Sequence, residues 1–267
     1  MAAGSYTVRF VQGFTWETEI GGLSAIVMQT LGTRGMALSD RGTLFDLQVR
    51  RGPDGIESID VLQRIALADG IVTETEFIDS EGLALASETD VFVSFEQIHQ
   101  VARFDIQTRE TETLPAPPGF QNVARNRGLE ALAIDDQGTL FTLAEHPRQG
   151  FDVWRWDENG WDQPFTLEAR DGFLAVSAEV GPDGRFYLLE RKITIFGFQT
   201  RLRRWDISQD AAFNETTLLT TRAGRFGNLE GLSLWRDGDG ALRATMVSDN
   251  NFQSFMRTQL VEYVLTE

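Results

Sequence analysis

Short runs of β-branched, aromatic and aliphatic residues alternate with turn residues along almost the whole chain. Four strand-length runs follow one another at residues 82–85, 91–95, 101–105 and 110–114. The next segment repeats this order at residues 129–134, 139–144, 153–157 and 163–167. Runs of this kind, separated by Gly, Pro, Asp and Asn, predict β-strands. No stretch keeps an apolar period of 3.6 residues over three turns, so we predict no helix.

Four strands per unit, at a period of roughly 50 residues, are typical of a β-propeller. Five such units lie at residues 21–66, 81–114, 128–168, 173–221 and 229–267. The last unit lacks one strand, and we expect residues 6–10 to supply it, which closes the ring and covers an exposed sheet edge. We therefore predict an all-β fold in which residues 1–267 form a single propeller domain of five four-stranded blades. A sixth blade, if residues 10–20 and 66–80 hold strands, and a two-sheet sandwich are the alternatives.

Acidic residues recur at two fixed places in this repeat. Those at the starts of first strands are Glu81, Glu130 and Glu230; those at the ends of second strands are Asp40, Glu96, Glu145, Glu190 and Asp249. In an antiparallel blade, the start of the first strand lies beside the end of the second. Because the first strand of every blade lines the central channel, we expect both sets to meet at one mouth of it.

Carboxylates that converge in this way need a cation, arginine partners or protons. Two bare carboxylates about 5 Å apart repel by about 3 kcal/mol at an effective dielectric constant of 20. Hard oxygen ligands, in a chain with no cysteine and two histidines, favour Ca²⁺, with Mg²⁺ and Mn²⁺ as alternatives. The predicted metal ligands are Glu81, Glu130, Glu190, Glu230, Asp249 and Asp40.

The composition narrows the classes of partner. The net charge of −16 argues against nucleic acid and anionic membranes, because both bind basic surfaces. No apolar run approaches the roughly 18 residues of a membrane span, so no membrane insertion is expected. The expected partner is therefore a small molecule, and an anionic substrate is one option. The oligomeric state is left open.

Four residues near the expected mouth are candidates for catalysis. His146 directly follows Glu145, and we expect His146, Glu145 or Glu96 to act as general base. The alternative for His146 is a loop histidine bonded to solvent or backbone. Arg127, three residues before Glu130, either steadies negative charge that develops on the substrate or pairs with the ring carboxylates. The sequence contains no Gly-x-Ser-x-Gly elbow, P-loop or dinucleotide fingerprint.

At these positions the chain resembles the bacterial phytase-like family known for an "esterase-like activity of phytase". The matching segments are Gly22-Leu23-Ser24, Ser39-Asp40-Arg41-Gly42, Ser80-Glu81-Gly82-Leu83-Ala84, Arg125-Asn126-Arg127-Gly128-Leu129-Glu130-Ala131-Leu132, Leu188-Leu189-Glu190-Arg191, Asn228-Leu229-Glu230-Gly231-Leu232 and Val247-Ser248-Asp249-Asn250-Asn251-Phe252. The resemblance covers most of the chain. It implies a propeller, commonly exported to the periplasm or beyond, with a divalent metal in the channel. The chain departs from the family at Val176-Ser177-Ala178-Glu179, where an Asp usually follows a Ser.

Two functions are consistent with these observations. The first is a metal-dependent hydrolase of esters, lactones or phosphoesters, in which the cation polarises the substrate and activates water. The second is a non-enzymatic propeller that binds a ligand or protein partner, with Ca²⁺ holding the blades together. Fold alone does not decide between them.

Overall fold

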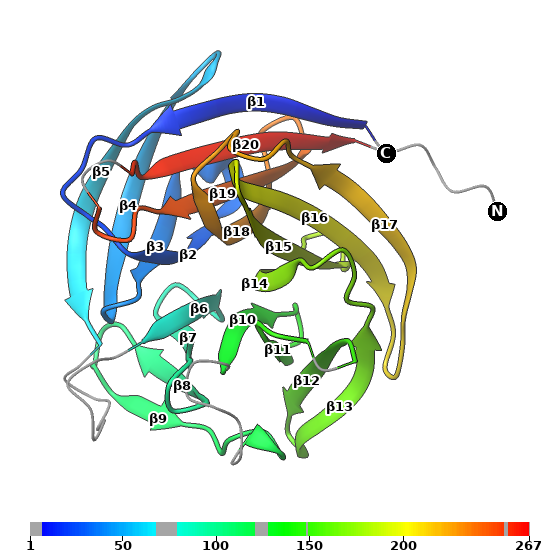
Figure 1. Ribbon diagram of the computed structural model, residues 1–267. Coiled ribbons are helices and arrows are strands. Elements are labelled where there is room, and N and C mark those ends of the chain that lie inside the picture. Colours follow the sequence, from blue (N-terminus) through cyan, green and yellow to red (C-terminus); the bar gives the residue numbers. More distant parts are fainter. Residues whose placement is uncertain (1–6, 68–78, 121–127, 148, 254–255, 267) are drawn as a thin grey trace.

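The computed structural model describes residues 7–67, 79–120, 128–147, 149–253 and 256–266. This part of the chain forms five antiparallel sheets of four strands each, arranged as blades around a central axis (Figure 1). The predicted all-β, five-bladed propeller is therefore confirmed. The described residues contain a single short helical element, the 3₁₀ turn η1 (Thr30–Gly32), and no helix among them is long and apolar enough to span a membrane.

Blades one to four run outward from the channel in chain order, and blade five does so except for its outermost strand, which comes from the N-terminal part of the chain. Blade one comprises β2 (Leu23–Met28), β3 (Arg34–Ser39), β4 (Thr43–Gly52) and β5 (Gly55–Ala66); blade two comprises β6 (Ser80–Leu85), β7 (Asp90–Phe95), β8 (Gln100–Asp105) and β9 (Thr111–Thr113). Blade three comprises β10 (Leu129–Ile134), β11 (Leu140–Ala144), β12 (Phe151–Asp157) and β13 (Gly160–Leu167). Blade four comprises β14 (Leu174–Val180), β15 (Phe186–Thr194), β16 (Gly197–Ile207) and β17 (Ala212–Thr220). Blade five comprises β18 (Asn228–Arg236), β19 (Leu242–Asp249), β20 (Gln259–Thr266) and, outermost, β1 (Thr7–Thr15).

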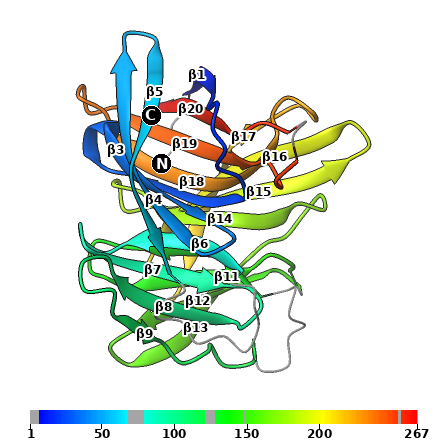
Figure 2. The ribbon, with the colours of Figure 1, turned by 90° about the vertical axis from the view of Figure 1, so that its left-hand side faces the viewer.

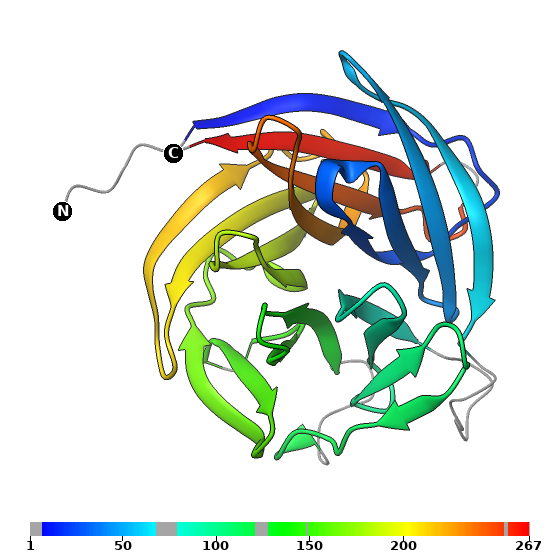
Figure 3. The same cartoon turned by 180° about the vertical axis from the view of Figure 1, so that it is seen from behind.

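The two ends of the chain close the ring together. β1 pairs antiparallel with β20, with Thr7 opposite Thr266 and Thr15 opposite Gln259. Figure 3, seen from behind, shows this blue strand outside the red one. The prediction that the N-terminal run completes the last blade is confirmed, and the strand extends five residues beyond the expected end at Phe10. Residues 10–15 thus belong to blade five and form no sixth blade.

Apolar side chains fill the spaces between neighbouring blades. Between blades three and four, for example, Phe141 packs with the buried Phe186 and Trp205. Side-chain hydroxyls link the inner strands across these same interfaces. The Ser24 hydroxyl donates to the Ser80 carbonyl at 2.8 Å, and the Ser177 hydroxyl accepts from the Leu232 amide at 3.2 Å. Burial and hydrogen bonding together hold the inner strands in a fixed ring.

The pairing of every inner strand is interrupted near its first residues. The register shifts between Leu23 and Ala25, Ser80 and Leu83, Leu129 and Ala131, Ala175 and Ser177, and Leu229 and Gly231. Such β-bulges bend a strand and re-aim one side chain. In blade five, Gly231 follows the bulge and lets β18 approach β2 closely. A Cβ atom at this position would lie 2.8 Å from the Ile26 amide nitrogen. The five blades thus present one equivalent, re-aimed residue each at the same end of the channel.

Candidate functional site

The residue at the bulge is acidic in three of the five blades. In chain order, the five equivalent residues are Ser24, Glu81, Glu130, Val176 and Glu230. The three glutamates influence one another electrostatically, because Glu130 and Glu230 both act on Glu81. The structure therefore brings together the predicted first-strand acids from blades two, three and five, as expected.

The second set of acids follows from the strand pairing. The residues opposite the last paired residue before each bulge are Ser39, Phe95, Ala144, Glu190 and Ser248. The residue that follows each of them reaches the mouth, and in chain order these residues are Asp40, Glu96, Glu145, Arg191 and Asp249. Four blades thus carry the predicted acid, whereas blade four carries an arginine.

Glu190 lies apart from this group, on the other side of β15. Its side chain is fully buried, and its two oxygens accept hydrogen bonds from Arg201 and Arg203 at 2.7–2.9 Å. A carboxylate already neutralised by two guanidinium groups offers no free charge to a cation. Because its pairing position is equivalent to Ser39 and Ala144, we leave Glu190 out of the ligand set.

The tightest group of acids lies at the start of blade two. One carboxylate oxygen each from Asp79, Glu81 and Glu96 lie within 4.8 Å of one another. Asp79 is absent from the predicted ligands, although its position two residues before Glu81 places both on one side of an extended chain. That spacing is the signal by which the sequence could have identified it.

The carboxyl groups at the mouth hold protons more tightly than ordinary acids. Burial, reinforced by Asp79, raises the pKa of Glu96 to about 7. Burial also raises the pKa of Glu230 to about 7, although Arg191 opposes the shift, and it raises the pKa of Asp40 to about 6 with help from Asp249.

The pKa values of Glu81 and Glu130 lie well above the usual range, through burial first and then through their acidic neighbours. Burial likewise raises the pKa of Asp249. The shared cause of all these shifts is burial, and acidic neighbours add to it for every one of these groups except Asp249. Such a site favours a cation.

Arg191 is the cation that reaches into this group from blade four. Its Nη2 donates to Glu145 Oε1 at 2.6 Å, and its Nη1 donates to Asn228 Oδ1 at 2.9 Å and to Glu230. Burial alone would lower the pKa of Arg191, but the carboxylates of Glu230 and Glu145 raise it. The residue is therefore held in its charged form at the centre of the acidic mouth.

The candidate catalytic residues have different surroundings. The side chain of His146 is 39% exposed, and its Nδ1 lies 2.8 Å from Glu145 Oε2 but makes no hydrogen bond to it. Glu96 belongs to the group formed with Asp79 and Glu81. Arg127 lies outside the described residues. Among the candidate catalytic residues that the structure describes, His146 is thus the one with a partly exposed ring beside a carboxylate.

A cation fits the group formed by Asp79, Glu81 and Glu96. Ca²⁺ binds oxygen ligands at about 2.3–2.6 Å, so two ligands of one ion are at most about 5 Å apart, and the three oxygens here satisfy this limit. Carboxylates of raised pKa gain from a cation because it removes the repulsion that favours their protonated form.

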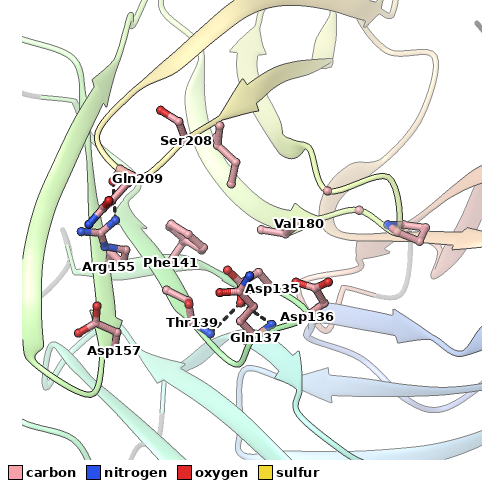
Figure 4. A pocket seen from close by; sticks show the side chains of 14 residues that line it. Asp135, Asp136, Gln137, Thr139, Phe141, Arg155, Asp157, Val180, Ser208 and Gln209 are labelled. Carbon is pink, nitrogen blue, oxygen red and sulfur yellow. Dashed lines mark hydrogen bonds between the residues drawn. The ribbon is translucent and has the colours of Figure 1, made fainter.

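A cavity of about 570 Å³ lies at the opposite end of the inner strands, between blades three and four (Figure 4). The turns that follow β10 and β14 line it. Its polar groups have local partners: Asp135 Oδ1 accepts from the Gln137 and Thr139 amides, and Arg155 pairs with Asp162. The cavity is thus separate from the acidic mouth.

A five-bladed propeller with a mouth lined by carboxylates defines the class to which this molecule belongs. A family model described as "Phytase-like: Esterase-like activity of phytase" matches residues 18–252. The chain therefore belongs to the phytase-like family, and the resemblance seen in the sequence is confirmed. No curated protein matches the sequence.

Two solved structures are similar over nearly the whole chain. The PQQ-bound form of aldose sugar dehydrogenase from Streptomyces coelicolor is 13% identical with a TM-score of 0.54, and the match covers 98% of this chain and 99% of that one. A luciferin-regenerating enzyme is 10% identical with a TM-score of 0.55, covering 97% and 95% of the two chains. At these identities the likeness supports the propeller fold alone.

Proposed function

We propose that the protein is a hydrolase of esters, lactones or phosphoesters that depends on a divalent cation and acts at the channel mouth. The observation that carries this proposal is the convergence of Asp79, Glu81 and Glu96, with oxygens within 4.8 Å. Membership of a family described by an esterase-like activity supports the hydrolytic chemistry. A small-molecule substrate agrees with a site enclosed by five blades.

Asp79, Glu81 and Glu96 would hold the cation. Their hard oxygens suit Ca²⁺, Mg²⁺ and Mn²⁺, and Ca²⁺ is preferred because it accepts irregular oxygen geometry, whereas Mg²⁺ requires a near-ideal octahedron. Glu130, Glu230, Asp249 and Asp40 are the further acids of the mouth, which add negative charge around the ion. When bound, a divalent cation polarises a carbonyl or phosphoryl oxygen and lowers the pKa of water.

His146 would accept the proton from the attacking water. Glu145 Oε2 lies 2.8 Å from His146 Nδ1, which is an ion-pair distance, although the two atoms do not form a hydrogen bond. This carboxylate would stabilise the positive charge that forms when the partly exposed ring takes up the proton. The other oxygen of Glu145 binds Arg191, so the carboxylate is itself held in place.

Turnover of a panel of aryl esters, lactones and phosphoesters, with added Ca²⁺ or with chelator, tests this function. We expect Ca²⁺-dependent turnover that falls by at least about tenfold in Glu81→Gln. Glu179→Gln is the matched control, because Glu179 is a buried acid that accepts from the Leu234 amide at 2.6 Å, away from the mouth. Full turnover in chelator contradicts the proposal. A large Ca²⁺-dependent rise in melting temperature with no turnover favours the non-enzymatic binding propeller.

Export to the periplasm is a further part of the proposal, and it rests on the family resemblance. An extracellular or periplasmic setting suits a Ca²⁺ site, since oxygen cages of moderate affinity fill only where Ca²⁺ is abundant. Cell fractionation with an antibody against the protein checks it, and recovery in the cytoplasmic fraction contradicts it.

A further inference from the structure

Blade four inverts the charge that the other four blades place at the mouth. Asp40, Glu96, Glu145 and Asp249 occupy one structural position, and Arg191 occupies the same position in β15. The bulge residue of blade four is also uncharged, being Val176. Among the five residues at this position, the positive charge therefore comes from blade four, and the other four are acids.

The hydrogen bonds of Arg191 leave part of its guanidinium group without a partner. A guanidinium has five N–H donors. Two serve Asn228 and Glu230 from Nη1, and one serves Glu145 from Nη2. Nε is buried and has no hydrogen-bond partner among the described residues. A buried donor without a partner is unfavourable, and a ligand oxygen that reaches this edge of the guanidinium would supply the missing acceptor.

We propose that Arg191 is the anchor for an oxyanion, a carboxylate or phosphate, carried by the substrate. This rests on the proposed function and names its substrate class as anionic esters. The Nε–H and the remaining Nη2–H lie on one guanidinium and suit an oxyanion with two oxygens. Asn228 and Glu230 hold the group through Nη1, and Glu145 holds it through one Nη2–H, so the anchor is oriented before the substrate arrives.

Binding must follow an order, because the mouth without a cation repels anions. Glu81, Glu96, Glu130 and Glu230 surround the approach with negative charge as they ionise. A divalent cation removes that repulsion, so oxyanion affinity rises once the cation is bound. By linkage, the oxyanion raises the cation affinity by the same factor.

Calorimetric titration of inorganic phosphate and of acetate, below the solubility limit of calcium phosphate, tests the anchor. We expect binding to Ca²⁺-loaded protein and none in chelator, and preference for one anion identifies phosphate or carboxylate as the group recognised. In Arg191→Gln the affinity falls at least about tenfold, the loss expected for a charge-assisted hydrogen bond. Arg191→Lys keeps the charge without the planar fork and binds with intermediate affinity.

Lys192→Gln is the matched control, because it removes one positive charge from the next residue of the same strand. Lys192 faces the other side of β15 and donates to the Asp171 carbonyl, so we expect unchanged anion binding. Equal anion binding by wild type and Arg191→Gln, or no anion binding by Ca²⁺-loaded wild type, overturns the anchor.

The two proposals fail in different ways. Arg191-dependent binding of phosphate with no turnover on any ester sustains the anchor and contradicts the hydrolase. Turnover of neutral and anionic esters with one specificity, reduced equally by Arg191→Gln, sustains the hydrolase and overturns the anchor. Ca²⁺ titration of Arg191→Gln is expected to give affinity at least equal to wild type, because the variant loses a competing positive charge.

Discussion

Glu190 and Arg191 are neighbours in β15, and they serve opposite sides of the strand. Glu190 is enclosed with Arg201 and Arg203, whereas Arg191 joins Glu145 and Glu230 at the mouth. Alternation along a strand separates them completely. Glu190 is consequently a structural counter-ion, although the sequence pattern placed it among the predicted metal ligands.

Substitution of Glu190 separates these roles. Glu190→Gln removes the buried carboxylate that Arg201 and Arg203 share and leaves them only the more exposed Asp171 and Glu215. We expect the free energy of unfolding to fall by about 3–5 kcal/mol. Urea denaturation measures this, and isothermal titration is expected to show Ca²⁺ affinity close to wild type. A variant of unchanged stability that has lost Ca²⁺ binding would instead return Glu190 to the ligand set.

The mouth acids make a pH prediction with a definite sign. The pKa values of Glu96 and Glu230 are raised to about 7 in the folded protein, above about 4.3 for unfolded glutamate. The fold thus favours the protonated forms, so their stabilisation is complete below about pH 4.3 and is lost as pH rises through 7.

In chelator we therefore expect the melting temperature to fall between pH 5 and 8, and Ca²⁺ to reverse the fall at pH 8. Glu230→Gln removes one titrating group and flattens the curve, while Glu57→Gln, on the hairpin that joins β4 to β5, leaves its slope unchanged. A melting temperature that rises with pH in chelator contradicts this prediction.

At the scale of the strand, β1 completes blade five and so closes the ring. It covers the edge of β20 over the register from Thr7 to Thr15, and without it blade five has three strands, with the apolar β20 as its unpaired outer edge. A chain that begins at residue 16 is expected to melt at least about 5 °C lower and to aggregate through β20. A synthetic peptide of residues 7–15 added in trans restores part of the loss. Unchanged melting without β1 would show that packing alone closes the ring.

The strands were largely predictable because their signal is local. Alternating apolar residues and turn glycines mark each strand, and the repeat spacing gives the number of blades. The β-bulges are set by contacts between blades, such as the close approach of Gly231 to Ile26, and the sequence does not reveal them. For the same reason the position of Arg191 emerged only from pairing Ala175 with Glu190, and Asp79 from its distance to Glu96.

At the scale of the whole molecule, the chain has a net charge of −16, and part of this negative charge is concentrated at one mouth of the channel. A ligand that binds only the folded state stabilises it by RT ln(1 + [L]/Kd), about 2.7 kcal/mol at a hundred times Kd. The melting temperature is therefore expected to rise with the logarithm of Ca²⁺ concentration. NaCl at equal ionic strength gives a smaller rise, because it screens exposed charges more than buried ones. Equal effects of the two salts would argue against a specific site.

The pairing of Thr7 with Thr266 also means that the chain ends lie in adjacent strands. A short linker joining them would let the polypeptide start elsewhere, for instance between Leu167 and Leu174, where blade three gives way to blade four. In that permutant every blade keeps its four strands, but the new chain ends lie at the interface between blades three and four. There the ring is held together by noncovalent contacts such as the hydrogen bond from the Ala175 amide to the Glu145 carbonyl. Comparing the stability of the two chains measures how much the pairing of β1 with β20 contributes to closing the ring. The new chain ends of the permutant lie beside Arg191, so any local opening of the ring there would affect the mouth.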